Sequence, residues 1–472
     1  MHRWRSSYCA PAAQLAHTAK LSTTAHKLCP TQSGAINSAA KDVAVIGGGF
    51  VGMSCALHAA LRGHRVHLFE RSPSLGTRDC TSYGNAGGFA RHAITPVNSP
   101  SLPRQLPSLL NSPESPLSLA PSLHLLRMVP WLLSFVYHCS MPKVEATTAA
   151  LASLLHEAEE GYKPLLDLLP PDQLEQMVNR ENILHIWSSQ KSWEGAQFKR
   201  DLQHQHGVQM QYLSADEMLE LEPKLQADRL YRGLLYPGTF GLKNPGGLVA
   251  ALAEALPRLG ATIHAGADVA AVEPSASGVR LRQSSPSAAT DDVLFDSVVV
   301  ACGAWSKQLA GTVGDSAHAA LDTERGYHIM FPEATDVVSR PICFADTGFY
   351  ISPMANGLRT AGTVELGGLH APPNPQRLDM IERVTRSVLS ADLPPRRRED
   401  DWLGFRPTMP DGLPVIGRSP RSERVVYAFG HHHIGWTLGG VTGRLVSQLL
   451  DDQPTDFDLT PFRIDRFNSA LF

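Results

Sequence analysis

The clearest pattern of hydrophobic and polar positions lies in residues 41–71. The apolar run DVAVI predicts a short strand that enters three glycines, residues 50–62 predict a helix that stops at Gly63, and HRVHLFE (64–70) predicts a second strand. Strand, helix and strand within about 30 residues form a βαβ unit. Such a unit requires a parallel sheet, because its two strands run in the same direction.

Later segments predict a second kind of sheet. Short alternating strands at 327–331, 348–353 and 358–366 indicate an antiparallel sheet, whereas from 402 the chain returns to strand, glycine loop and helix. Strands are also expected at 261–264, 278–283 and 296–301, helices at 144–169 and 246–259, and loops at 99–121 and 284–292. The leucines Leu151, Leu154, Leu155, Leu165 and Leu166 are expected to face inward.

Chain length and composition exclude several classes of protein. The chain has 472 residues, 43% hydrophobic and 18% charged, with a net charge of −3, which does not suggest a general nucleic-acid binder. Its seven cysteines are scattered and contain no C-x-x-C, so a disulfide framework or zinc site is not expected and a reducing compartment fits. The apolar stretch 123–139 is interrupted by Arg127, Pro130 and His138. It predicts a buried or amphipathic helix pair, and peripheral membrane association stays open.

The first 41 residues differ from the rest of the chain. They contain no Asp or Glu, many Ser, Thr and Ala, and the bases Arg3, Arg5, Lys20, Lys27 and Lys41. This composition is typical of a transit peptide, with mitochondrion favoured over plastid. The alternative is an unstructured extension without targeting meaning.

A glycine motif carries the first prediction of chemistry. Gly47, Gly49 and Gly52 form G-x-G-x-x-G between strand and helix, where backbone N–H groups favour a pyrophosphate. Glu70 ends the second strand, where a carboxylate can accept hydrogen bonds from ribose hydroxyls. With the flanking Phe50, Val51 and Arg71, these residues predict a dinucleotide site.

Two further segments favour FAD over NAD. After the second strand the chain is polar and glycine-rich instead of helical, and this segment supplies Thr81, Ser82, Asn85, Gly87 and Gly88 as cofactor-binding residues. Gly303 follows the strand at 296–301, and near the C-terminus Gly430, Gly435, Trp436 and Thr437 precede or open a helix whose N-terminus can face the flavin pyrimidine. A cofactor contacted by both ends of the chain is characteristic of flavoproteins.

These motifs together carry a resemblance to a known family. DVAVIGGGFVGMSCALHAALRGHRVHLFER, TSYGNAGG, LDTERGYH and GFRPTMPDGLPVIG followed by GHHHIGWT resemble the D-amino acid dehydrogenase branch of the FAD-dependent D-amino acid oxidase superfamily, over residues 42–450. The resemblance implies a mixed α/β (α+β) fold: a Rossmann-like FAD-binding domain built from separated segments, and a substrate domain with a mixed or antiparallel sheet.

The resemblance also implies where the domains and the FAD lie. We predict the FAD-binding domain at 42–120, 220–310 and 400–472, and the substrate domain at 121–219 and 311–399. Covalent attachment is not expected, because Asn85 stands where some relatives attach FAD through His, and residues 403–408 hold no Cys. We therefore predict non-covalent FAD.

Four residues are candidates for the catalytic site. By resemblance, Arg406 binds the substrate carboxylate, in agreement with the fork geometry of a guanidinium; the alternative is an arginine that pins a loop. Tyr350 is expected to donate to the same carboxylate or to cover the flavin, His328 to face the site, and one of the adjacent histidines, with His431 first, to face flavin or substrate. Tyr350 and His328 each also suit a purely structural role. No metal is expected, because three adjacent histidines cannot all point at one ion.

The predicted reaction is oxidation of the C–N bond of a small amine, with a D-amino acid favoured, and transfer of electrons to a quinone or another carrier. An oxidase of glycine, sarcosine or D-amino acids that uses oxygen is the near alternative. A non-catalytic flavoprotein, such as an assembly factor on the same fold, is the alternative from another class.

Overall fold

A parallel sheet forms one half of the fold and confirms the predicted βαβ unit. The computed structural model describes residues 39–112, 115–285, 293–315 and 319–468. The sheet has the order β10 (Thr262–Ala265), β2 (Arg65–Glu70), β1 (Asp42–Ile46), β14 (Ser297–Val300), β22 (Val425–Phe429) and β21 (Val415–Arg418), and only β21 is antiparallel to its neighbour. Val43, Ala44 and Val45 of β1 are fully buried, because both faces of this central strand are covered.

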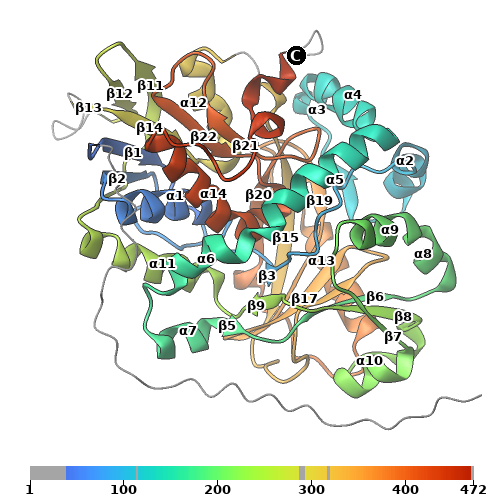
Figure 1. Cartoon of the computed structure of the whole chain (residues 1–472). Helices are drawn as coiled ribbons and strands as arrows, with labels where there is room; N and C mark the ends of the chain where they lie inside the picture. Colours follow the sequence, from blue (N-terminus) through green and yellow to red (C-terminus); the bar gives the residue numbers. More distant parts are fainter. Residues whose placement is uncertain (1–38, 113–114, 286–292, 316–318, 469–472) are drawn as a thin grey trace, which may run out of the picture. The chain divides into compact units, whose positions relative to one another are not determined.

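Close helix packing covers one face of this sheet. Helix α14 (Gly435–Leu450) crosses α1 (Phe50–Leu61) and α6 (Ala158–Leu166), as Figure 1 shows. A Cβ at Gly439 would lie 2.5 Å from the Phe50 ring, and one at Gly440 would lie 2.7 Å from the Gly161 backbone. The glycines within α14 therefore let helices approach closely. The opposite face of the sheet packs on α12 (Ser306–Val313) and a small sheet of β11 (Val269–Pro274), β12 (Val279–Gln283) and β13 (Leu294–Phe295).

A ten-stranded mixed sheet forms the other half, as predicted. Its order is β4 (Leu117–Leu119), β19 (Val364–Leu366), β15 (Asp322–Phe331), β18 (Gly357–Ala361), β17 (Phe349–Met354), β16 (Ile342–Phe344), β6 (Ile183–Trp187), β8 (Arg232–Tyr236) and β7 (Gln211–Leu213), with β20 (Trp402–Thr408) also on β15. Its core includes α10 (Ala215–Leu221) and α13 (Pro375–Val388). Three short strands, β3 (Gly88–Phe89), β9 (Phe240–Leu242) and β5 (Val178–Asn179), form a further small sheet.

The predicted division into two domains stays a prediction. Three strands pair in a different sheet from the one that this division implies. Strands β4, β8 and β20 pair within the ten-stranded sheet, although their residues were assigned to the FAD-binding part. A short alternating pattern predicts a strand without saying which sheet it joins, because both sheets offer a half-buried place.

The segment at 99–121 is not a loop throughout. It contains α2 (Leu102–Asn111), with Pro103 in its first turn, and β4. Pro103 in the first helical turn removes no helical hydrogen bond, and the helix also continues through Pro107, so the Pro and Ser content of this segment does not indicate a loop. The predicted helix at 144–169 is two helices, α5 (Met141–His156) and α6, and four of its five expected inward leucines are buried while Leu166 is half-buried. The remaining helices are α3 (Leu123–Arg127), α4 (Val129–Tyr137), α7 (Pro171–Met177), α8 (Gln190–Gly195), α9 (Gln197–Gln205) and α11 (Pro245–Ala255).

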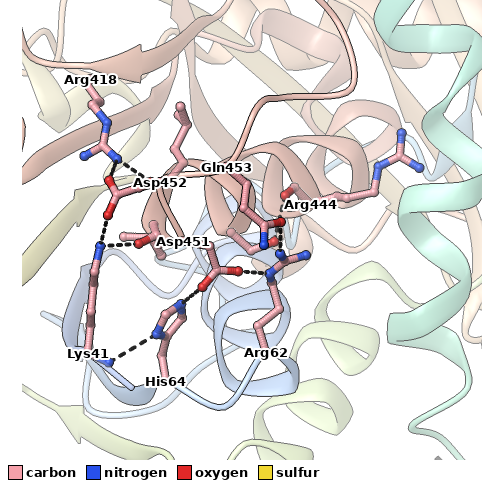
Figure 2. A network of polar contacts seen from close by, with 11 residues as sticks. Lys41, Arg62, His64, Arg418, Arg444, Asp451, Asp452 and Gln453 are labelled. Atoms are coloured by element: carbon pink, nitrogen blue, oxygen red, sulfur yellow. Dashed lines mark hydrogen bonds and ion pairs between the residues drawn. The ribbon is translucent and has the colours of Figure 1, made fainter. Parts of the chain in front are cut away.

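A polar network fixes the first described residues to the end of α14 (Figure 2). The Lys41 ammonium donates to the Asp452 carboxylate at 2.7 Å, and the Lys41 backbone N–H donates to Nδ1 of His64 at 3.3 Å. The buried Asp451 carboxylate lies 3.0 Å from His64 Nε2, and it also forms an ion pair with the Arg62 guanidinium. The folded body is therefore tied down from Lys41 onward. The predicted transit peptide falls on residues 1–38, outside the described residues, apart from its last three positions.

Candidate active site

A cleft runs along the carboxyl ends of β1 and β14, and it brings most of the predicted cofactor residues together. The predicted residues that line it are Gly47, Gly49, Phe50, Val51, Glu70, Arg71, Thr81, Ser82, Asn85, Gly303, Gly435 and Trp436, together with His431. In open α/β sheets, ligands bind at this end of the strands. The cleft therefore lies where the glycine motif predicts it.

Each glycine of the motif has a different physical role. Gly47 has φ +107°, and a Cβ there would lie 2.5 Å from the Ala301 carbonyl oxygen. A Cβ at Gly52 would lie 1.9 Å from the Gly47 carbonyl oxygen, so Gly52 allows helix α1 to pack on the strand. At Gly49 the nearest neighbour is the Ser82 hydroxyl at 3.6 Å, so this glycine leaves open space on the cleft side.

The carboxylate of Glu70 is held in place at the end of β2. It accepts the Gly48 backbone N–H at 2.6 Å on one oxygen and the Ser72 N–H at 2.9 Å on the other. A carboxylate oxygen has a second lone pair, so each oxygen can accept another donor from the cleft. Beside it, the Arg71 guanidinium lies 3.8 Å from the centre of the Trp305 ring, a residue that the sequence did not single out.

Hydrogen bonds between side chains and backbone groups hold the polar segment after β2 against the rest of the site. The Ser82 hydroxyl accepts the Phe50 N–H at 3.0 Å, and the Trp436 indole N–H donates to the Ser82 carbonyl at 2.9 Å. From the ten-stranded sheet, the buried Arg359 donates to the Asn85 carbonyl at 2.7 Å. The segment therefore joins the two sheets, with Ser82 and Asn85 on the cleft.

Five predicted cofactor residues lie outside the cleft lining. Gly52 packs helix α1 on its strand, Gly88 pairs in β3, and the hydroxyl of the buried Thr437 accepts the Ala90 N–H at 2.9 Å. Gly87 and Gly430 have positive φ, +79° and +81°, so each forms a turn that other residues rarely adopt. These glycines shape the backbone around the cleft, and Thr437 joins α14 to the segment before it.

Arg406, on β20, lies flat over the backbone of the neighbouring strand. A Cβ at Gly326 of β15 would lie 2.5 Å from the guanidinium carbon, so only glycine leaves room for it. One Arg406 nitrogen donates to the Thr363 carbonyl at 2.7 Å. The buried Glu324 is its partner in the strand register; burial raises the pKa of Glu324, and the Arg406 charge opposes that rise.

Tyr350 belongs to a chain of polar aromatic side chains that the sequence did not reveal. Its hydroxyl lies 3.1 Å from Nε2 of His185, which lies 3.1 Å from Nε2 of His92. Burial lowers the pKa of His185 to about 3, so the ring is neutral near pH 7. Tyr236 stacks on His92 with ring centres 3.8 Å apart. No periodicity could predict this cluster, because its members come from β6, β8, β17 and the segment after β3.

His328 is buried and contacts Gly84 and Trp402. Its Nδ1–H donates to the Gly84 carbonyl at 3.0 Å, and its ring stacks on Trp402 with centres 5.0 Å apart. Burial holds the pKa of His328 well below its usual value. His328, Tyr350 and Arg406 are not among the residues that line the cleft, so the catalytic roles predicted for these three residues stay predictions.

Of the three adjacent histidines, His432 and His433 lie in a 3-10 turn, His432–Ile434, at the start of α14, and His431 is the residue directly before this turn. Nε2 of the buried His431 lies 2.9 Å from the Thr442 hydroxyl, and Nε2 of His432 accepts the Met409 N–H at 3.1 Å. Both line the cleft. The side chain of His433 is exposed.

The described residues were also compared with the requirements of a metal site, a disulfide and a membrane-spanning helix. Among the described residues, no group of three or more His, Cys, Asp or Glu side chains could hold a metal ion, and all five described cysteines are free. No described helix is both long and apolar enough to cross a membrane.

Comparison with known proteins places this geometry in a family. A family model for FAD dependent oxidoreductases (DAO) matches residues 42–449. The chain belongs to the FAD dependent oxidoreductase family. This oxidoreductase therefore uses FAD, and the residues of the cleft fit that cofactor: Gly49 leaves the space needed beside the N-terminus of α1, and Glu70 offers free lone pairs.

Individual relatives agree with the family. The oxidoreductase is 35% identical to the D-amino-acid oxidase of Bradyrhizobium diazoefficiens over 90% of this chain and 99% of that protein. It is 29% identical to D-amino acid dehydrogenase 2 of Ralstonia nicotianae over 90% of this chain and all of that protein. The glycine oxidase structure from Geobacillus kaustophilus has the same fold, with a TM-score of 0.65, 23% identity and coverage of 90% of this chain and 98% of that one.

Proposed function

We propose that this oxidoreductase oxidises the C–N bond of a D-amino acid and passes the electrons to a quinone or another carrier. The position of Arg406 carries the proposal: its guanidinium is laid over Gly326, is held by the Thr363 carbonyl, and stays cationic at all physiological pH values. A fixed planar fork of this kind is suited to a carboxylate. The names of the two relatives, a D-amino-acid oxidase and a D-amino acid dehydrogenase, support this substrate class.

The buried polar cluster that contains His185 and Tyr350 suits an amine substrate. When bound, FAD would accept a hydride from the substrate C–H bond, and this hydride carries the two electrons of the oxidation. The chain has to orient a deprotonated amine. His185 is neutral near pH 7 because burial lowers its pKa to about 3, so it does not repel a substrate ammonium before that group loses its proton. Tyr350 offers a hydroxyl next to it.

Anaerobic reduction of the bound flavin tests the proposal. The FAD-loaded protein is mixed without oxygen with D- and L-amino acids, glycine and sarcosine, and we expect at least one D-amino acid to bleach the flavin absorbance. Arg406→Ala should keep its FAD but lose about a hundredfold or more in kcat/KM, because charge-assisted hydrogen bonds are about twice as strong as neutral ones. Absence of bleaching by every compound would refute catalysis and favour the non-catalytic flavoprotein.

An oxidase that uses oxygen is the second candidate, and the 35% identity to a D-amino-acid oxidase favours it. Peroxide release separates the two. The dehydrogenase proposal predicts slow peroxide formation in air and fast turnover with a soluble quinone. Stoichiometric peroxide without an added acceptor would establish the oxidase instead.

We also propose a mitochondrial location. The acid-free, Ser-rich composition of residues 1–41 supports it, and this segment lies outside the family match, which begins at residue 42. Residues 1–41 fused to a fluorescent protein should direct it to mitochondria. A diffuse or plastid signal would refute this.

A further inference from the structure

An apolar surface covers the outer side of helices α3 and α4 and the first residue of α5. Seven large hydrophobic side chains between 123 and 141 are exposed, half of the fourteen such residues found in the described chain. Two of them, Leu123 and Leu126, are 74% and 70% exposed. We call this surface the α3–α4 face; it consists of Leu123, Leu126, Val129, Leu133, Val136, Tyr137 and Met141.

The inner side of the same helices is already packed. Met128 and Trp131 are buried against Leu366 of β19, with partly buried neighbours from β4. Both sides of this helix pair are thus apolar, whereas a surface helix of a globular protein normally turns a polar side to water. In Figure 1, α3 and α4 lie next to each other at the upper right, on the outside of the fold. Patches of this kind mark sites of interaction with a protein or a membrane.

The charge around the face indicates its partner. Between Asp79 and Glu145 the sequence has four basic residues, Arg91, Arg104, Arg127 and Lys143, and one acidic residue, Glu114. Lys143 lies 5.2 Å from the centre of the exposed Tyr137 ring, at the rim of the face. Exposed aliphatic side chains with a basic rim and an interfacial aromatic fit a bilayer that contains anionic lipids. A second copy fits less well, because a two-fold dimer would bring these like charges together.

We infer that the α3–α4 face docks the protein on the surface of a membrane rich in anionic lipids. Helices of five and nine residues cannot cross a bilayer, so the contact is interfacial. The face is anchored next to the candidate active site: Val364 packs into its base, and the preceding Thr363 carbonyl holds Arg406. Delivery of electrons to a lipid-soluble acceptor is the consequence, and only this consequence rests on the proposed function.

Vesicle binding by the full-length, FAD-loaded protein tests the inference without any substrate. We expect the protein to float with vesicles of phosphatidylcholine and phosphatidylglycerol, and less with phosphatidylcholine alone. Leu126→Glu combined with Leu133→Glu should reduce the vesicle-bound to free ratio at least about tenfold, because two apolar contacts are replaced by charges that anionic lipid repels. Both side chains are exposed, so FAD content and unfolding temperature should not change.

A matched control carries the same charge change elsewhere. Leu61→Glu combined with Tyr212→Glu alters two exposed apolar residues outside the face and should bind vesicles like the unmodified protein. Every variant keeps residues 1–41, so any binding by that segment is common to all. Arg127→Gln with Lys143→Gln should remove the preference for anionic vesicles.

Three results would overturn the inference. The first is failure of the unmodified protein to bind either vesicle type. The second is equal binding by the face variant and its matched control. The third is a dimer, detected by light scattering, that Leu126→Glu with Leu133→Glu dissociates while vesicle binding stays unchanged, because the face would then be a contact between copies of the chain.

Discussion

Replacing Gly326 with alanine should displace the arginine proposed to bind substrate without disturbing the fold. An added Cβ would lie 2.5 Å from Cζ and Nη2 and 2.6 Å from Nη1 of Arg406. The obstructed atoms are the far end of a flexible side chain, so the guanidinium moves and the paired strands stay.

The size of the effect follows from that distance. Ordinary carbon contacts begin near about 3.5 Å, so the guanidinium has to move by about 1 Å. A misplacement of about 1 Å in a positioning group can cost about a hundredfold in rate. The net value of a hydrogen bond to a charged group, about 1.5–3 kcal/mol, gives a loss of roughly tenfold to a hundredfold in kcat/KM. We therefore expect Gly326→Ala to fall in that range and Arg406→Ala to equal or exceed it.

The assay compares two substrates on the same variant. Anaerobic flavin reduction is followed with a D-amino acid and with the matching amine that lacks the carboxylate. Gly326→Ala should lose activity with the first and keep it with the second, with FAD content unchanged. Gly195→Ala is the control, because a Cβ at Gly195 meets nothing within 4 Å.

Two outcomes would refute this reasoning. If Gly326→Ala oxidises the D-amino acid as fast as the unmodified protein, the position of the Arg406 guanidinium does not matter for catalysis. If both substrates slow equally, the substitution has disturbed the site in general, and Arg406 is not a carboxylate anchor.

Three further predictions concern cofactor, boundary and pH. Gly49→Asp should fold, because aspartate is a good helix N-cap, but should retain at most about a tenth of the FAD since its charge faces the expected pyrophosphate; full FAD content would contradict this. A chain that begins at Ala40 should stay soluble and yellow because it keeps the Lys41 anchor, and aggregation would show that earlier residues are structural. Burial lowers the pKa of His58 from 6.5 to about 4. The contribution of the neutral His58 ring to the free energy of unfolding is therefore present above pH 6.5 and is lost as the pH falls to about 4, by about 1.4 kcal/mol per pH unit. His58→Gln, whose amide can donate to the Gly161 carbonyl as the imidazole does, should flatten that slope in urea titrations, and parallel slopes would contradict the assignment.

Local sequence was sufficient for the cofactor half of the site. The strand, the glycine motif and Glu70 lie within 30 residues, so local backbone geometry nearly fixes their positions, and the structure brings Gly47, Gly49 and Glu70 to one cleft. The same local reasoning failed at 99–121, where proline in a first helical turn was read as a loop signal.

What the sequence determined by itself was the parallel sheet, the dinucleotide motif and the presence of an arginine in a family-like position. Only the tertiary structure decided which residues surround that arginine. Gly326 makes room for it across a strand pair, and the polar chain through Tyr350, His185 and His92 joins elements that are distant along the chain. The outward turn of the apolar α3–α4 face was decided in the same way. Periodicity shows that a segment has two sides, but which side meets protein, water or lipid depends on packing between elements that no local pattern contains.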